Sequence, residues 1–196
     1  MTRLFNARDI QAALALDLPP PPPDGKLASS PALSIEERFD LDQGLLQLEV
    51  RNHGTQEAVF HLYDGLVPSP SAHRYRLRGE RSLSLSWPAD LYDLHFLAPD
   101  GLYRRFAGRL KADGATSATL IPARRGVGLI LGLTSPDTVW FCVIDESGRR
   151  TARRSRVLAG DRPHLRVPVT SDGWYDVSVS RVGGDFRRRF AGRVPV

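Results

Sequence analysis

The sequence predicts an all-β protein made of two tandem immunoglobulin-like β-sandwich domains, preceded by a short helix and a polyproline linker. From residue 35 onward, short segments alternate apolar and polar residues with a period of two, and turn residues separate these segments. Seven such segments occur in the first half and seven in the second. One hexapeptide also occurs in both halves, which indicates an internal repeat.

Three regions are expected along the chain. Residues 1–34 contain the N-terminal helix and the linker, 35–112 the first sandwich, and 113–196 the second. A helix is predicted over 6–16 because a capping arrangement precedes apolar residues that fall on one side. The unbroken run Pro19–Pro23 must be extended and stiff, since proline fixes its own backbone and cannot donate a hydrogen bond.

The alternating segments give the expected strands directly. In the first half they fall at 35–40, 45–51, 57–63, 73–78, 80–86, 90–97 and 102–109. In the second half they fall at 117–122, 127–133, 138–144, 153–158, 163–169, 173–181 and 186–194. Because a side chain on a strand points to the face opposite that of its neighbour, each segment has one apolar and one polar face.

The two halves repeat each other in sequence. Arg-Arg-Phe-Ala-Gly-Arg stands at 104–109 and again at 188–193, and Tyr92-Asp93-Leu94 recurs as Tyr175-Asp176-Val177. Further upstream, 59–64 matches 140–145. The order of these matches is kept and only the loops between them differ in length. The sequence therefore predicts a tandem duplication of one domain.

The last two strands of each unit form a hairpin that carries most of the repeated residues. Cross-strand ion pairs are expected on its polar face: Asp93 with Arg105 or Arg109, and Asp176 with Arg189 or Arg193. Gly108 and Gly192 mark either a bulge or a close backbone approach. The residues assigned to this structural signature are Tyr92, Asp93, Arg105, Phe106, Gly108, Tyr175, Asp176, Arg189, Phe190 and Gly192.

The net charge of +5 comes almost wholly from arginine, since Lys26 and Lys111 are the only lysines. Arginine suits phosphate, but it is also what a GC-rich coding sequence favours, so charge alone identifies no partner. One cluster lies in the connection between the third and fourth strands of the second half. Its members are candidate contacts for anionic lipid head groups or an acidic partner: Arg149, Arg150, Arg153, Arg154 and Arg156. The alternative is a solvated loop, because the first-half counterpart, 69–74, is rich in proline and serine.

No catalytic residue, metal ligand or cofactor site is predicted. The histidines are scattered singly, and no serine or cysteine stands in a recognisable set with one of them. Cys142 is the only cysteine and is expected to be an inert buried thiol. Nucleic-acid binding is not expected, because aromatic residues are not interleaved with the basic ones. No apolar window is long enough to span a membrane, and no export signal is present, which predicts a cytoplasmic location if the chain is a complete product.

The repeated unit resembles the C-terminal domain of bacterial phosphocholine-specific phospholipases C over roughly residues 40 to 196. The elements that carry this resemblance are Asn52-His53-Gly54, Val59-Phe60, Arg74-Tyr75, Gly79, Trp87, Tyr92-Asp93-Leu94 and Gly101 to Gly108. Where that family tends to read Gly-Pro-Asn-Gly-Phe, this chain has 98–102 in the first copy and 182–186 in the second. The turn-forming residues are retained in both copies.

The resemblance implies a non-catalytic accessory module. In that family the domain occurs in two copies after a large catalytic domain, which hydrolyses phosphatidylcholine or sphingomyelin and has no counterpart in residues 1–40. The implied partners are that parent domain or a phospholipid surface, and the implied location is extracellular or periplasmic. The alternatives are a free-standing protein-interaction module derived from such an enzyme and a carbohydrate- or anion-binding sandwich.

Overall fold

A computed structural model of the chain describes residues 33–67, 72–88, 90–98, 101–113, 115–123, 128–147 and 151–194. The helix expected over 6–16 and the proline run at Pro19–Pro23 lie outside these described residues. Within them the chain is almost entirely β, and its only helix is the four-residue α2, Leu110–Asp113. The predicted all-β class is confirmed.

Fourteen strands form where the alternating pattern predicted them, each within two residues at both ends. In the first half they are β1 (Leu33–Asp40), β2 (Leu45–Asn52), β3 (Ala58–Asp64), β4 (His73–Leu77), β5 (Arg81–Pro88), β6 (Leu91–Leu97) and β7 (Tyr103–Arg109). In the second half they are β8 (Ser117–Pro122), β9 (Leu129–Thr134), β10 (Val139–Asp145), β11 (Ala152–Val157), β12 (His164–Val167), β13 (Trp174–Arg181) and β14 (Arg187–Arg193).

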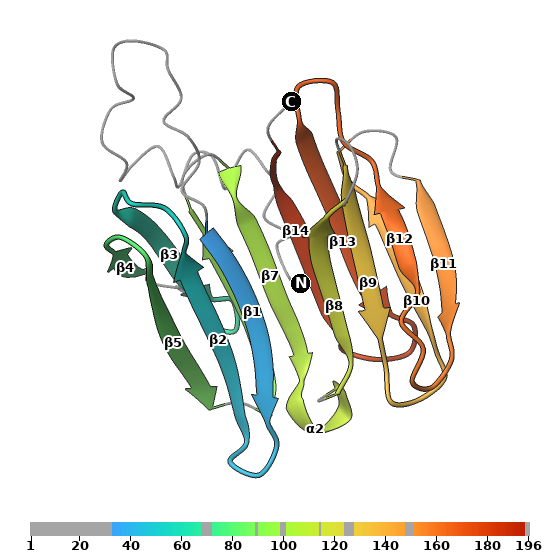
Figure 1. Cartoon of the computed structure of the whole chain (residues 1–196). Coiled ribbons are helices and arrows are strands. Elements are labelled where there is room, and N and C mark those ends of the chain that lie inside the picture. The colour runs from blue at the N-terminus through green and yellow to red at the C-terminus, as the bar shows by residue number, and fades with distance from the viewer. Residues whose placement is uncertain are drawn as a thin grey trace.

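The strands form three sheets. Two have three strands each, in the orders β1-β2-β5 and β12-β9-β8, and the third has eight in the order β11-β10-β13-β14-β7-β6-β3-β4. Figure 1 shows the two small sheets side by side, each covering its own half of the large sheet. The chain visits the small and large sheets in the same order in both halves, as a duplication requires.

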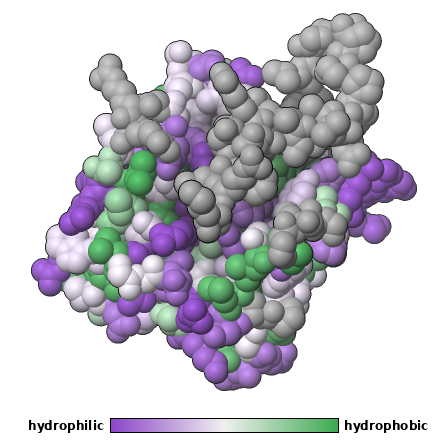
Figure 2. Space-filling view, turned by 180° about the vertical axis from the view of Figure 1, so that it is seen from behind, coloured by the Kyte–Doolittle hydropathy of each residue, from purple (hydrophilic) through white to green (hydrophobic). Residues whose placement is uncertain are grey.

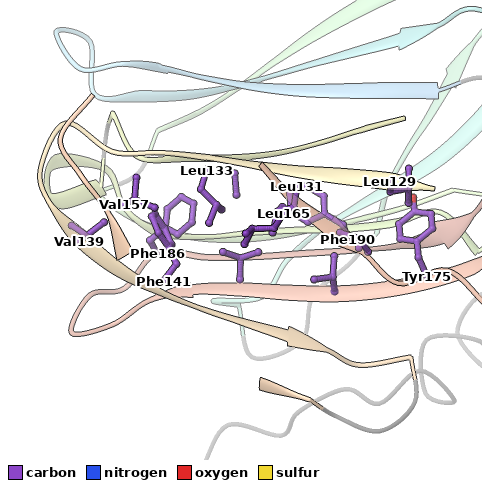
Figure 3. Packing of buried hydrophobic residues seen from close by; sticks show 14 residues of the cluster. Leu129, Leu131, Leu133, Val139, Phe141, Val157, Leu165, Tyr175, Phe186 and Phe190 are labelled. Carbon is purple, nitrogen blue, oxygen red and sulfur yellow. The ribbon is translucent and has the colours of Figure 1, made fainter. Parts of the chain in front are cut away.

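Each repeat has its own hydrophobic core between its small sheet and its half of the large one. In repeat 2, Leu131 and Leu133 of β9 face Phe141 and Phe190 of the large sheet, and all four are buried (Figure 3). In repeat 1, alternate residues of β2, β3 and β6 fill the equivalent space. Two inner faces packed in this way are the immunoglobulin-like arrangement predicted from the sequence.

The two sandwiches are joined through their large sheets, which the sequence did not predict. The last strand of repeat 1, β7, pairs antiparallel with the last strand of repeat 2, β14. An unpaired strand edge exposes a row of backbone donors and acceptors, so pairing these two edges satisfies both. The eight-stranded sheet therefore has one continuous outer face, which no other described sheet covers.

Candidate functional site

The duplicated hexapeptide forms the junction between the repeats, with one copy in β7 and the other in β14. Its positions oppose each other symmetrically: Arg105 faces Arg189, Arg104 faces Phe190, and Phe106 faces Arg188. A strand that pairs with its own copy in this register creates a local twofold axis, as at an isologous dimer interface. The first and third residues of each copy therefore stand opposite the third and first residues of the other.

Arg188 extends from β14 into the core of repeat 1. Its Nη1 donates to the Ala107 carbonyl at 2.7 Å, and its Nη2 donates to the Tyr92 hydroxyl at 2.9 Å. Its Cζ lies 4.2 Å from the centroid of the Phe186 ring. Glu37 of β1 accepts from Nε at 2.9 Å, and its other oxygen lies 2.7 Å from Nη2. The Arg188 side chain is 0% exposed and that of Glu37 is 6% exposed, so the ion pair is buried.

The electrostatics of this cluster follow from its burial. Burial raises the pKa of Glu37, and the adjacent Arg188 guanidinium opposes that rise only in part. Burial also raises the pKa of Tyr92 to about 12, although Arg188 acts in the opposite direction. A buried charge is tolerated only when it is paired and hydrogen-bonded, and here the guanidinium is both.

Arg104 makes the equivalent contacts in the opposite direction, from β7 into repeat 2. Its Nη1 donates to the carbonyls of Tyr103 and Ala191, both at 2.8 Å. Its Nη2 donates to the Tyr175 hydroxyl at 2.9 Å, and its Cζ lies 5.5 Å from the centroid of the Phe190 ring. Each repeat thus places one arginine in the other, and the two are held together reciprocally.

The two crossing arginines differ in their acidic partner. Glu37 comes from β1, whereas the corresponding strand of repeat 2, β8, contains no acidic residue. Among the described residues, no carboxylate lies within 4.0 Å of Arg104, which is only half-buried. The buried ion pair of the junction therefore belongs to Arg188 alone.

The predicted cross-strand ion pairs are present on the outer face of the large sheet. Arg105 donates to both carboxylate oxygens of Asp93 at 2.8 Å. In repeat 2, Arg189 donates to Asp176 at 2.9 and 2.7 Å. The sequence left two possible arginine partners for each aspartate, and the structure shows that Arg105 and Arg189 are the ones that pair. Arg109 contacts other carboxylates. The second arginine of each hexapeptide is thus held within its own repeat.

Asp93 has further partners that its counterpart Asp176 lacks among the described residues. His95 lies with Nε2 3.2 Å from Asp93, and its Nδ1 is 2.9 Å from the Tyr103 hydroxyl. Burial alone would raise the pKa of Asp93, but hydrogen bonds from His95 and Arg105 outweigh it and lower the pKa to about 2. Burial raises the pKa of Tyr103 to about 12.

The lowered pKa of Asp93 predicts a loss of stability in acid. A carboxyl group whose folded pKa lies below its unfolded value of 3.8 stabilises the fold above that value, and the contribution disappears as the pH falls towards 2. Asp93→Asn should remove about 1–2 kcal/mol at neutral pH and less at pH 2. Urea unfolding of both proteins across this pH range measures the difference. Parallel curves for the two proteins would contradict the prediction.

The repeated glycines accommodate tyrosine side chains. A Cβ atom on Gly108 would lie 2.7 Å from the Tyr92 hydroxyl, and one on Gly192 would lie 2.7 Å from the Tyr175 hydroxyl. Each glycine stands directly opposite its tyrosine in an uninterrupted register. Of the two alternatives, a close approach at the backbone is therefore present and a bulge is not.

The predicted arginine cluster lies partly outside the described residues. Arg149 and Arg150 lie outside the described residues, whereas Arg153, Arg154 and Arg156 lie within strand β11 and are exposed. They therefore belong to the strand predicted at 153–158 and not to the connection that precedes it. Their strand alternation separates Arg153, which shares a face with the buried Val157, from Arg154 and Arg156, which point to the outer face.

The first half also carries equivalent arginines, contrary to the expectation of a proline- and serine-rich counterpart. Arg76 of β4 stands opposite Val59, as Arg156 stands opposite Trp140. Arg74 lies two residues before Arg76 and points to the same face. Both edge strands of the large sheet therefore present a pair of exposed arginines on its outer face.

No group of three or more His, Cys, Asp or Glu side chains in the described part of the chain is placed to hold a metal ion. Cys142 is half-buried rather than buried, because it occupies an outer-face position of β10 between Arg154 and Ser180. The expectation of a buried thiol was wrong.

The junction residues that the sequence did not single out are Arg104, Arg188 and Glu37. Arg104 and Arg188 each stand two residues before a core phenylalanine, Phe106 and Phe190, so the strand period places them on the apolar face. An arginine on an apolar face, repeated in both halves, was the available signal. Glu37 has no such signal, since it is 151 residues away from Arg188 in sequence.

Comparison with protein families assigns both repeats. The family model described as bacterial phospholipase C, C-terminal domain, matches residues 33–109 and again residues 118–193. The chain belongs to this family. It contains the C-terminal domain of bacterial phospholipase C twice, and each match ends on the last residue of the duplicated hexapeptide.

The family assignment accounts for the tandem pair predicted from the sequence. No curated protein matches the chain. In the described part of this phospholipase C C-terminal domain pair, no helix is long and apolar enough to cross a membrane.

Proposed function

We propose that the chain is the non-catalytic accessory module of a phosphocholine-specific phospholipase C and helps the parent enzyme engage phosphatidylcholine or sphingomyelin. The observation that carries the proposal is the family match to both repeats. In this proposal the partners are the parent catalytic domain and the phospholipid surface, and the site of action lies outside the cytoplasm. The two modules are residues 35–112 and 113–196, connected through α2.

The geometry supports a binding role for the outer face. The best-organised ionic groups, Arg188 with Glu37 and Arg105 with Asp93, are already paired within the protein. By contrast, Arg154 and Arg156 are exposed at the edge of the large sheet. Guanidinium groups bind phosphate oxygens in a bidentate manner, so these two are suited to lipid head groups.

Co-sedimentation with liposomes tests the proposed lipid role. The chain is expected to pellet with phosphatidylcholine vesicles and more completely with vesicles that contain an anionic lipid. Raising the salt concentration from about 0.1 M to about 1 M should reduce the additional binding to the anionic vesicles, because salt screens exposed charges. Absence of binding to both kinds of vesicle would overturn the lipid role and favour a protein-interaction module.

A second assay tests the non-catalytic part of the proposal. The chain is incubated with phosphatidylcholine, and release of phosphocholine is followed against a protein-free control. We expect release at the background rate. Release at an enzyme-like rate would contradict the proposal.

A further inference from the structure

Three exposed apolar residues occupy neighbouring strand positions at one corner of repeat 2. Trp140, Leu158 and Val182 are 49%, 47% and 49% exposed. Val182 stands opposite Trp140, with its amide donating to the Trp140 carbonyl at 2.8 Å. Leu158 directly follows the end of β11, where the amide of the next residue donates to the Thr138 hydroxyl at 3.3 Å. We call Trp140, Leu158 and Val182 the tryptophan corner.

The tryptophan corner lies on the outer face of the large sheet together with two arginines. Arg156 is the register partner of Trp140, and Arg154 is the partner of Cys142. Phe141, which lies between Trp140 and Cys142, points into the core. So does Val157, which lies between Arg156 and Leu158. Figure 2 shows the side of the molecule opposite to that of Figure 1, where hydrophobic residues form patches between hydrophilic ones. Because Arg156 is the register partner of Trp140, apolar and basic groups are adjacent at this corner.

Repeat 1 provides an internal reference for this corner, because strand register identifies the equivalent positions. Val59 occupies the position of Trp140, and Arg78 that of Leu158. Glu57, which directly precedes β3, occupies the position of Thr138. Glu57 accepts from Arg78 at 2.6 Å and lies 3.8 Å from Arg76. The corner of repeat 1 is therefore charged, and Glu57 pairs with two arginines there.

The corner of repeat 2 differs in each of these respects. Thr138 stands where repeat 1 has the acidic Glu57, Trp140 where it has Val59, and Leu158 where it has the basic Arg78. Among the described residues, no carboxylate lies within 4.0 Å of Arg154 or Arg156. At this corner, and among the described residues, repeat 2 thus places exposed apolar groups beside two arginines without a carboxylate partner, whereas the same corner of repeat 1 places Arg76 and Arg78 beside Glu57.

We infer that the tryptophan corner, with Arg154 and Arg156, is the surface through which the chain contacts a phospholipid bilayer. Tryptophan favours the boundary between head groups and acyl chains, because its ring is apolar and its N–H finds water or a head group. Leu158 and Val182 can enter the same boundary, while the arginines reach the phosphates. This inference rests on the proposed lipid role and assigns that role to repeat 2.

Tryptophan fluorescence with brominated phosphatidylcholine vesicles tests the inference. The chain has three tryptophans, Trp87, Trp140 and Trp174, and bromine quenches only those that reach the acyl chains. The wild type should lose fluorescence on binding. Trp140→Phe should abolish at least half of that loss. Trp174→Phe is the control and should leave the loss intact, because Trp174 is 37% exposed but packs against Gly101.

A charge variant provides an independent test. Thr138→Glu introduces the acid that repeat 1 has at Glu57. It should weaken binding to anionic vesicles about fivefold, since one charge near such a surface contributes roughly 1 kcal/mol. The matched control is Thr55→Glu, the same change at an exposed position of repeat 1, which should alter binding less than about twofold. Unchanged thermal unfolding confirms that each variant is folded.

The outcomes separate this inference from the proposed function. If the wild type binds vesicles but Trp140→Phe leaves the quenching intact and Thr138→Glu leaves the affinity intact, the inference is wrong and the lipid role stands. If the wild type binds no vesicles, the lipid role is wrong and the inference falls with it. A surface that then binds a purified protein partner would be a protein-contact site.

Discussion

Replacing Glu37 by leucine is expected to lower the free energy of unfolding by about 3–5 kcal/mol, the usual cost of removing one partner from a buried ion pair. Arg188 would keep its hydrogen bonds to the Ala107 carbonyl and the Tyr92 hydroxyl. It would, however, lose the only carboxylate placed against it among the described residues, at 2.7 Å from Nη2. The remaining positive charge has no exposed route to water, since the side chain is 0% exposed.

Urea unfolding of Glu37→Leu measures this loss, and two controls define its cause. Arg78→Ala removes an ion pair to Glu57 whose arginine is 79% exposed, and it should cost less than about 1 kcal/mol. Combining Glu37→Leu with Arg188→Met removes both charges and should recover a large part of the loss, as apolar replacement of buried pairs does elsewhere. A cost for Glu37→Leu no greater than that for Arg78→Ala would show that the pair does not stabilise the junction.

The Glu37–Arg188 ion pair could not be predicted from the sequence, whereas the strands and the hairpin ion pairs could. The strands were predictable, because alternation and turn residues are local properties, and β13 at Trp174–Arg181 follows directly from such a pattern. The Asp93–Arg105 pair was predictable as well, because its two strands form one hairpin. The pairing of β7 with β14 joins edges of two separate units, and local pattern carries no information on which edges meet.

The symmetric register explains why the hexapeptide is retained in both halves. Its first arginine crosses to the other repeat, its second pairs with an aspartate of its own, and its phenylalanine enters the core. Only the first arginine needs the other repeat, since the second arginine and the phenylalanine act within their own. The arginine surface at β11 was predicted by composition alone, and only strand register revealed that Arg154 and Arg156 share a face with Trp140.

The glycine of the hexapeptide provides the second large effect. Gly108→Ala is expected to lower the free energy of unfolding by about 3 kcal/mol, at the upper end of the range for overpacking a core. The new Cβ would stand 2.7 Å from the Tyr92 hydroxyl and 2.9 Å from an Asp113 carboxylate oxygen. Neither neighbour can move freely, because the hydroxyl accepts from Arg188 and the carboxylate accepts from the Arg109 amide.

Gly192→Ala serves as the matched control in repeat 2. There the three nearest atoms all belong to Tyr175, with the hydroxyl again at 2.7 Å, and no buried carboxylate is among them. We expect a smaller loss, about 1–2 kcal/mol, because one side chain rather than two must be displaced. Equal losses at both positions would mean that the Asp113 side chain moves away from the new Cβ without a measurable loss of stability.

A double-mutant cycle identifies the clash that causes the loss at Gly108. Tyr92→Phe removes the hydroxyl and leaves an Arg188 hydrogen bond unmade, so by itself it should cost about 1–2 kcal/mol. In the Gly108→Ala background the same change also relieves the shortest contact, so the combined loss should be smaller than the sum of the two single losses. Strict additivity would place the strain at Asp113 and would show that Gly108 is retained for the carboxylate rather than for the tyrosine.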